Sequence, residues 1–288
     1  MAEEPIGLSL VLPVHRGAQW IELNLSIVLE CLERVEDGFE LVVVCDGDDD
    51  LASEGARRIA ARDHRVNVFH YPCNQGKGFA ISFGVAQSRG RLIGWLDADL
   101  DIAPEVIVRA VASFAASEID AAIGSKRHEA SAVTYPAIRR CYSWGYQLLV
   151  RSLFRLSVRD TQVGAKVFRR EMLTTVVPLL LVKRWAFDLE VLAVGAQFGF
   201  DRVVEVPVQL TTGFSGTNVD WRAVRNMLLD TLAIGYRLHL RNWYAKRFAS
   251  LQRTRGAARF PAAPRHLGRL ETTSPESIGA AARSRRAS

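Results

Sequence analysis

The amino-acid sequence predicts an α/β fold, in which helices flank a mostly parallel sheet. Short apolar runs rich in β-branched residues alternate with longer stretches of helical period, which is typical of strand–helix–strand units. Polar clusters follow three of these runs, at residues 45–50 (CDGDDD), 74–78 (NQGKG) and 97–101 (DADLD). Because open parallel sheets bind ligands at the carboxyl ends of their strands, we expect the three clusters to meet at one edge.

The first part of the chain supplies these elements in turn. The β-branched apolar runs predict strands at residues 8–14, 39–45, 66–71, 91–96 and 121–124. The stretches between them predict helices at residues 18–34, 51–63, 78–88 and 104–116. The last of these helices starts with Pro104, at the position where a helix tolerates a missing N–H.

The pattern changes after residue 134. Residues 135–156 interleave leucine and aromatic side chains with arginines, as in a helix that lies in a membrane interface. A further strand is expected at 203–210, followed by a basic, aromatic-bearing helical region at 221–248. The Ala, Pro, Ser and Arg content of residues 250–288 cannot bury a core, so we expect a disordered tail there.

Positive charge is concentrated at the C-terminal end of the chain. The formal net charge is +6: residues 250–288 carry +6, residues 220–249 carry +4 and residues 1–219 carry −4. We therefore expect a folded domain at 1–219, basic amphipathic helices at a membrane surface at 220–249, and an Arg-rich tail. A basic end indicates an anionic partner, either a membrane face or a nucleic acid. The folded part has no RNA- or DNA-binding signature, so no nucleic-acid partner is expected.

Other features bear on the compartment. No apolar run approaches the roughly 20 residues that cross a bilayer, and the first residues, MAEEPIG, lack the pattern of an export signal. The four cysteines are scattered without metal-ligand spacing, as expected of reduced thiols. We expect a cytoplasmic protein that lies peripherally on the inner face of a membrane.

The acidic cluster at Asp97, Asp99 and Asp101 is a candidate metal site. It follows a buried-looking strand, and carboxylate oxygens suit Mg²⁺ or Mn²⁺, which share their coordination shell with substrate phosphates. A divalent ion there would neutralise charge on a departing diphosphate. The alternative is a solvated acidic loop that caps the next helix, because so short a motif is common by chance.

Two further clusters are candidates for nucleotide binding. The glycines around Lys77 would let backbone amides and an ammonium group approach phosphate oxygens, although an ordinary helix-entry turn has the same composition. No Ser or Thr follows Lys77 and no GxGxxG is present, which disfavours ATPase and dinucleotide-binding functions. Asp46 and the aspartates after it could hold a ribose or a base, or form a turn.

Eight motifs occur in an order that resembles the polyprenyl-phosphate glycosyltransferases. They are VLPV (11–14), VVVCDG (42–47), NQGKGFAISFGVAQSRG (74–90), IGWLDADLD (93–101), GSKR (124–127), DTQVGAKVFRRE (160–171), RWAFDLEVL (184–192) and EVPVQL (205–210). Dolichyl-phosphate glucosyltransferase and dolichyl-phosphate mannose synthase typify this group within glycosyltransferase family 2. The resemblance covers residues 7–248 and implies a GT-A catalytic domain over residues 1–219.

The resemblance also implies site residues. The nucleotide side would comprise Pro13, Asp46, Lys77 and Asp97, and the metal would be held by Asp99 and Asp101. The donor diphosphate or the acceptor phosphate would face Arg127 and Arg139 or Arg140. The acceptor side would be lined by Asp160, Gln162 and Lys166, with Asp188 near the reacting centre as an orienting group or weak base. Structural alternatives remain open, such as a surface charge at Arg127 and a helix N-terminal carboxylate at Asp188.

The implied reaction is inverting transfer of a hexose from a nucleotide diphosphate sugar, with a UDP-sugar favoured, to a polyprenyl phosphate. A phosphate monoester has a second pKa of about 6 and is largely ionised at neutral pH, so it needs alignment more than deprotonation. One alternative is a glycosyltransferase for a soluble or polysaccharide acceptor. Another is a catalytically silent nucleotide-binding protein, because His15, Arg16 and Cys45 depart from the Asn-Glu and Asp of many relatives.

Overall fold

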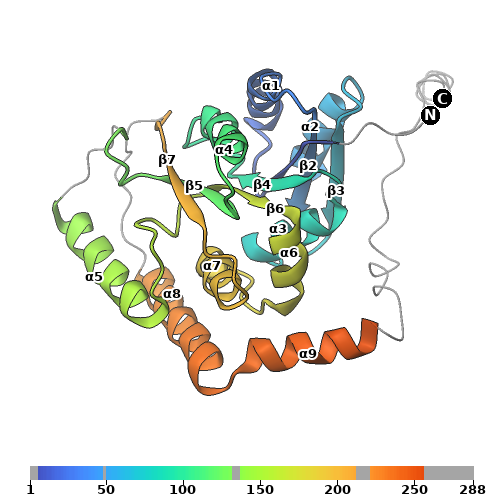
Figure 1. Cartoon of the computed structure of the whole chain (residues 1–288). Coiled ribbons are helices and arrows are strands. Elements are labelled where there is room, and N and C mark those ends of the chain that lie inside the picture. The colour runs from blue at the N-terminus through green and yellow to red at the C-terminus, as the bar shows by residue number, and fades with distance from the viewer. Residues whose placement is uncertain (1–5, 48–49, 132–136, 212–220, 256–288) are drawn as a thin grey trace, which may run out of the picture.

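The computed structural model describes residues 6–47, 50–131, 137–211 and 221–255 (Figure 1). One seven-stranded sheet has the strand order β3-β2-β1-β4-β6-β5-β7, and only β6 runs antiparallel to its neighbours. The strands are β1 (Leu8–Val14), β2 (Phe39–Asp46), β3 (Val66–Tyr71), β4 (Leu92–Leu96), β5 (Ala121–Ser125), β6 (Ala165–Arg169) and β7 (Val203–Pro207).

Helices cover both faces of the sheet. They are α1 (Ile21–Leu32), α2 (Asp50–Ala60), α3 (Lys77–Gln87), α4 (Glu105–Ala116), α5 (Ala137–Phe154), α6 (Arg170–Val176), α7 (Phe187–Gln197), α8 (Trp221–Gly235) and α9 (Trp243–Arg255), with a 3₁₀ turn η1 (Val177–Leu179) and a π turn η2 (Tyr236–Leu240). Helices α1, α2 and α4 lie on one face, whereas α3, α6 and α7 lie on the other (Figure 1).

Successive side chains of a strand point to opposite faces of the sheet, so they alternate between the two hydrophobic cores. In β1, Leu8, Leu10 and Leu12 are buried among α1, α2 and α4, whereas Val11 is buried on the opposite face. Parallel strands with both faces covered read as nearly continuous apolar runs, which is why β1 and β2 were predictable as strands. The predicted α/β class and the order of the first elements are confirmed, with element ends displaced by a few residues.

The strand β6 and the helices α6 and α7 were not predicted. Lys166 interrupts the apolar run of β6, and this strand fits between β4 and β5 only through long-range antiparallel pairing. Strand β7 ends at Pro207, short of the predicted residue 210, because the chain leaves the sheet there. After Pro207 the chain runs beside the segment that follows the acidic cluster. There the Ala103 N–H donates to Gln209 O at 2.9 Å, and Ile102 forms a β-bridge with Leu210.

The C-terminal helices pack on the second core. Ile234 of α8, Leu238 of η2 and Tyr244 of α9 are buried in the same cluster as α7. The helical region predicted at 221–248 is interrupted by the π turn and by Asn242, whose φ is 46°. Helix α9 continues to Arg255, so the start of the expected tail is helical; residues 256–288 lie outside the described residues. Within the described chain, every helix is too short or too polar to span a bilayer.

Candidate active site

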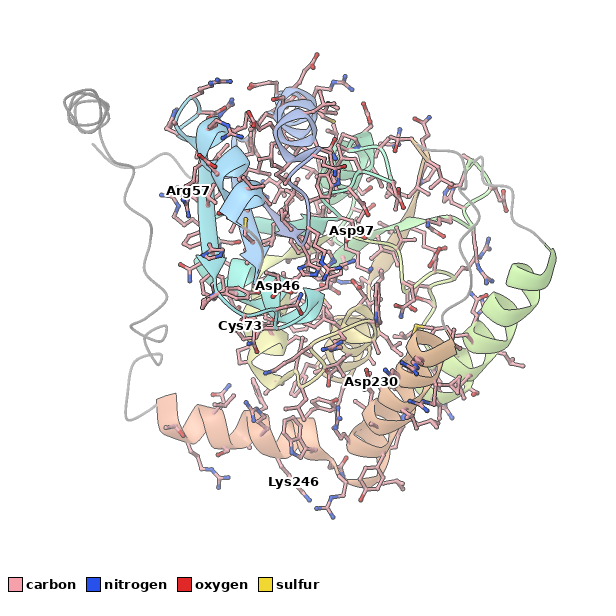
Figure 2. All side chains as sticks on the ribbon, turned by 180° about the vertical axis from the view of Figure 1, so that it is seen from behind. Asp46, Arg57, Cys73, Asp97, Asp230 and Lys246 are labelled. Carbon is pink, nitrogen blue, oxygen red and sulfur yellow. The ribbon has the colours of Figure 1, made fainter. Side chains whose placement is uncertain are left out.

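Two of the three polar clusters are joined directly at the carboxyl edge of the sheet. The Lys77 ammonium lies 2.5 Å from Asp97 Oδ1, which links the lysine loop before α3 to the acidic cluster after β4. Asp46, at the end of β2, accepts hydrogen bonds from the N–H groups of Gln75 (2.7 Å) and Gly76 (2.9 Å). Asp46 and Asp97 accordingly lie near each other at this edge of the sheet (Figure 2). The predicted meeting of these loops is observed.

The turn after β2 packs against the lysine loop with no space for a side chain. Gly47 has a φ of 60°, and a Cβ on it would lie 1.8 Å from the backbone nitrogen of Asn74. His15, just beyond β1, has its Nδ1 3.1 Å from Asp46 O and 3.2 Å from Asn74 Nδ2. The ends of three consecutive strands therefore form one surface, to which His15 contributes.

The acidic cluster is held in a tight turn. Leu100 is buried with a φ of 53°, a left-handed conformation that is unusual for leucine and is tolerated only where neighbours hold it. Thr211 supplies this support, because its hydroxyl donates to Leu100 O and its N–H donates to Asp101 O at 3.2 Å. Asp99 Oδ1 accepts from the Asp101 N–H at 3.3 Å. The turn thus presents Asp99 and Asp101, both exposed, at the edge of the sheet.

Asp97 is confined from the opposite side by Gly164. The Asp97 N–H donates to Gly164 O at 3.1 Å, and a Cβ on Gly164 would lie 1.8 Å from Asp97 Oδ2. The residues before β6 reach this edge because β6 is antiparallel, so that its first residue, Ala165, pairs with Leu96 at the end of β4. The reversed strand therefore brings the motif at 160–166 beside the acidic cluster.

Electrostatics at this edge favour a bound cation. Desolvation by the surrounding protein, followed by the negative charge of Asp97, raises the pKa of Asp99 above its usual value. Burial alone would lower the pKa of Lys77, but the charges of Asp97 and Asp188 outweigh it and raise that pKa. Among the described residues, no three His, Cys, Asp or Glu side chains gather closely enough to hold a metal by themselves. The oxygens of Asp99 and Asp101 fit a divalent cation that takes its remaining ligands from phosphates and water.

Asp188 lies in the first turn of α7 and is 4% exposed. Its Oδ1 accepts from the Trp95 indole N–H at 3.1 Å and from the Lys166 ammonium at 2.7 Å. Lys166 is fully buried and also donates to Val163 O. Lys166, predicted to line the acceptor side, is thus engaged by Asp188, and its position fits a group that orients that carboxylate.

The other predicted acceptor residues lie where α5 covers the chain before β6. Asp160 accepts from the N–H groups of Lys126 (3.2 Å) and Gln162 (3.3 Å), and burial raises its pKa. The Gln162 side-chain amide donates to Tyr146 OH at 3.4 Å. The Arg127 guanidinium donates to the side-chain oxygen of Gln147. Side chains of α5 therefore hold both Gln162 and Arg127.

Three predicted site residues remain, and among them only Pro13 has a described side chain. Pro13 is partly buried in β1, paired with Val44, next to the surface formed by the strand ends. The side chains of Arg139 and Arg140, and residues 48 and 49 of the CDGDDD cluster, lie outside the described residues.

Tyr146 and Thr231 adjoin the candidate residue Gln162, and the sequence analysis did not select them. The Tyr146 hydroxyl lies 3.1 Å from Thr231 Oγ1, which joins α5 to α8 beside Gln162. Desolvation is the main cause of the raised pKa of Tyr146, and the charge of Asp188 adds to it. A tyrosine within an amphipathic helix is usually interpreted as a packing or interfacial residue. Nothing in the sequence therefore distinguished Tyr146 from its neighbours.

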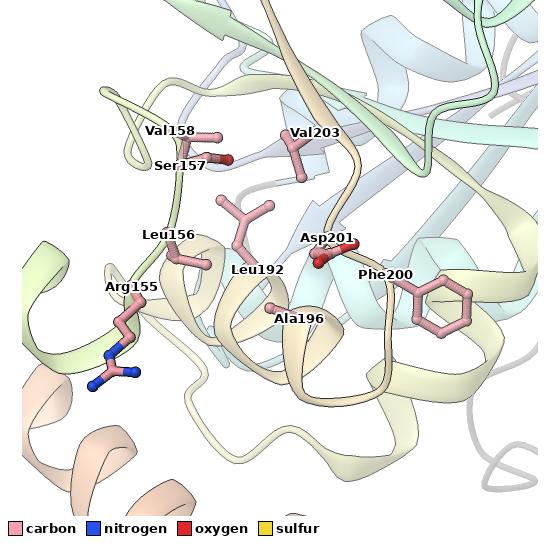
Figure 3. Close-up of a pocket in the computed structure, with 9 residues that line it drawn as sticks. All are labelled: Arg155, Leu156, Ser157, Val158, Leu192, Ala196, Phe200, Asp201 and Val203. Atoms are coloured by element: carbon pink, nitrogen blue, oxygen red, sulfur yellow. The ribbon is translucent and has the colours of Figure 1, made fainter.

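A cavity of about 180 Å³ lies elsewhere, at the far end of α7 from Asp188 (Figure 3). Leu192 and Ala196 of α7 line it, and Arg155 and Asp201 line it from opposite sides (Figure 3). None of the predicted site residues lines this cavity. The candidate site residues therefore lie outside this cavity, and Lys77 and Asp97 lie at the carboxyl edge of the sheet.

Comparison with known proteins identifies the fold and the family. Glucosyl-3-phosphoglycerate synthase from Mycobacterium tuberculosis, solved with Mn²⁺, UDP and glucosyl-3-phosphoglycerate, superposes with a TM-score of 0.59 at 19% identity, covering 80% of this chain and 79% of that one. The architecture is therefore the GT-A fold. The family model for glycosyl transferase family 2 matches residues 9–176, and the chain belongs to this family.

Two curated relatives extend the similarity along the chain. Glycosyltransferase AglD of Haloferax volcanii is 32% identical over 241 residues, which is 83% of this chain and 37% of the relative. Dolichyl-phosphate beta-glucosyltransferase ALG5C of Trichomonas vaginalis is 30% identical over 210 residues, 69% of this chain and 62% of the relative. The chain thus spans between about a third and two thirds of the length of these relatives.

Proposed function

We propose that this protein is a glycosyltransferase that moves a hexose from a nucleotide diphosphate sugar, with a UDP-sugar favoured, to the phosphate of a polyprenyl phosphate. The observation that carries this proposal is the 2.5 Å ion pair between Lys77 and Asp97, because it unites the lysine loop and the acidic cluster at one edge. Relatives named as dolichyl-phosphate glucosyltransferases support the choice of acceptor, and the UDP in the neighbouring structure supports the donor.

The donor side is formed by the ends of the first four strands. Pro13, Asp46 and His15 lie where a nucleoside would sit, and Lys77 and the amides of its loop would meet the diphosphate. Asp99 and Asp101 would hold Mg²⁺ or Mn²⁺, which would neutralise the charge on the leaving diphosphate. Asp97 would keep Lys77 in place until phosphate oxygens compete for the ammonium.

The acceptor side is formed by the segment before β6 and by α5. Arg127, with Arg139 or Arg140, would bind the donor diphosphate or the acceptor phosphate, and Gln162 would help to align the latter. Asp188 would orient the reacting groups from its buried position, held by Lys166 and Trp95. An ionised phosphate oxygen needs no strong base, so we expect in-line attack on the anomeric carbon with inversion.

An exposed apolar face on α8 and η2 supports a membrane-bound acceptor. Leu229 is 57% exposed, Leu232 is 47% exposed and Leu240 is 76% exposed, and they are accompanied by the exposed basic side chains Arg225 and Arg241. Leucines beside arginines suit the boundary between acyl chains and anionic headgroups. Because α8 contacts α5 through Thr231 and Tyr146, this face adjoins the acceptor side.

Product analysis tests the proposal. Purified protein is incubated with Mn²⁺ or Mg²⁺, a panel of nucleotide sugars and either polyprenyl phosphate or water-soluble phosphoglycerate, and the products are identified by mass spectrometry. We expect a hexosyl phosphoryl polyprenol with one donor and no product with phosphoglycerate. Transfer only to the soluble acceptor would overturn the lipid acceptor, and no transfer despite nucleotide binding would support a silent nucleotide-binding protein.

A further inference from the structure

We infer that Glu190 is a positioning residue through which the C-terminal helices hold the donor-binding loop in place. This inference rests on the proposed function, because it assigns the control of the donor site to residues outside it. Glu190 lies on α7, close to Asp188 in the chain, and its side chain is fully buried. No candidate site residue described above contacts this carboxylate.

The Glu190 carboxylate joins three separate segments. Its Oε2 accepts from the N–H groups of Leu181 (3.0 Å) and Val182 (2.8 Å), in the loop that leads into α7. Its Oε1 accepts from the Tyr244 hydroxyl of α9 (2.6 Å) and from the Arg237 guanidinium of the π turn η2 (3.3 Å). Both oxygens are thus used, one for the loop and one for the C-terminal helices.

The loop held by Oε2 continues directly to the lysine loop of the donor site. Lys183 O accepts from the Gly78 N–H at 2.9 Å, and the Lys183 ammonium lies 5.5 Å from the centre of the Phe79 ring. A Cβ on Gly76 would lie 2.6 Å from Lys183 O, so the two loops are in close contact. A displacement of residues 181–183 would therefore shift Gly76 and Gly78, which lie on either side of Lys77.

The groups held by Oε1 lie next to the exposed apolar face. Arg237 is flanked by Tyr236, which is 52% exposed, and η2 ends at Leu240, which is 76% exposed. Tyr244 is fully buried, and burial together with the charge of Glu190 raises its pKa, which keeps the hydroxyl protonated as a donor. Arg237, one of the two donors to Oε1, therefore lies in the same turn as exposed residues of this face.

Burial of the Glu190 carboxylate makes the connection between the loop at 181–183 and the C-terminal helices rigid. Losing one donor leaves part of a buried charge unpaired, so the remaining segments must shift to satisfy it. The π turn fits this role, because π turns are rare distortions that frequently occur at functional positions. The path from the C-terminal helices to the donor loop consists only of observed contacts, from Tyr244 through Glu190 and Val182 to Lys183.

The variant Tyr244→Phe tests this inference because it removes one hydroxyl and retains the ring. The matched control is Phe248→Leu, which loosens the packing of α9 against Phe198 without touching the carboxylate. Isothermal titration calorimetry measures the Kd of UDP and of GDP in the presence of Mn²⁺, and thermal unfolding measures stability. We expect the Kd of the bound nucleotide to rise about fivefold or more in Tyr244→Phe and to remain unchanged in Phe248→Leu.

Steady-state kinetics add a second readout. Tyr244→Phe should raise the KM for the nucleotide sugar with little change in the KM for polyprenyl phosphate, which a general loss of stability would not do. Equal nucleotide Kd values in wild type and Tyr244→Phe would overturn the inference and leave the proposed function standing. Failure of the wild type to bind either nucleotide would overturn both.

Discussion

At the scale of single residues, Asp99 carries the clearest expectation. Its carboxylate is exposed at the edge of the sheet, where desolvation and the charge of Asp97 raise its pKa. Asp99→Ala should abolish glycosyl transfer, since the cation would lose a ligand, and should change the free energy of unfolding by less than about 0.5 kcal/mol. Product formation and thermal unfolding are measured on the same preparation; full activity would remove the metal assignment.

The buried pair of Lys166 and Asp188 makes a separate prediction about stability. Lys166→Met leaves Asp188 buried without its cation, which should destabilise the fold by about 3–5 kcal/mol. Adding Asp188→Asn should restore most of this stability, because an amide carries no charge and still accepts from Trp95. Chemical denaturation measures the free energy of unfolding of Lys166→Met, of Asp188→Asn and of the double variant. Additive losses in the double variant would contradict a mutually dependent pair.

Gly164 tests whether the position of Asp97 matters. A Cβ at this glycine would collide with Asp97 Oδ2, at 1.8 Å, so Gly164→Ala should displace the partner of Lys77 and weaken binding of UDP with Mn²⁺ about tenfold or more. Gly145→Ala on α5 is the control, because nothing lies within 4 Å of its Cβ and alanine favours a helix by roughly 1 kcal/mol. Equal UDP affinities in both variants would contradict this account.

Residue identity alone predicted where some of these residues lie and missed others. Lys77, Asp46 and the DADLD carboxylates were predictable because glycines and aspartates at strand ends have specific uses. The burial of Lys166 was not predictable, because lysine is normally exposed and only the antiparallel β6 places it beneath Asp188. Nothing in the sequence marked Glu190 either, since its side-chain partners Arg237 and Tyr244 lie 47 and 54 residues further along the chain.

At the scale of elements, the sheet explains why prediction succeeded for its N-terminal half. Strands β1, β2 and β4 are buried on both faces and run parallel to one another, and β3 is a parallel, partly buried edge strand, so local composition identifies them. Strand β6 depends on pairing between β4 and β5, which no local pattern reports. The antiparallel direction of β6 also brings residues 160–166 beside the acidic cluster, so the position of the proposed acceptor side was harder to predict.

The apolar face of α8 and η2 gives a prediction about membrane binding. Leu229→Ser and Leu232→Ser should each weaken binding to phosphatidylserine-containing vesicles about tenfold, because each removes an exposed leucine from contact with acyl chains. Vesicle flotation measures this binding. Leu51→Ser is the control, since Leu51 is 60% exposed on α2, on the other side of the sheet. Unchanged flotation of the α8 variants would remove this face from the proposal.

At the scale of the whole molecule, charge is divided unevenly along the chain. The carboxylate-lined edge belongs to the GT-A fold, whereas positive charge accumulates in the C-terminal helices. The sequence predicted this division from composition, but it did not predict that α8 and α9 would share a core with α7. That shared core places the exposed leucines of α8 on a helix that contacts α5 and, under the proposed function, links them through Glu190 to the loop that would bind the donor.

The central claim is that the ends of the strands form one site for a nucleotide diphosphate and a divalent cation. A crystal structure of the protein with UDP and Mn²⁺, using anomalous scattering to locate the metal, tests it most directly. We predict an anomalous peak beside Asp99 and Asp101, with the diphosphate between this cation and Lys77. A nucleotide bound elsewhere, or a cation distant from these carboxylates, would contradict the account.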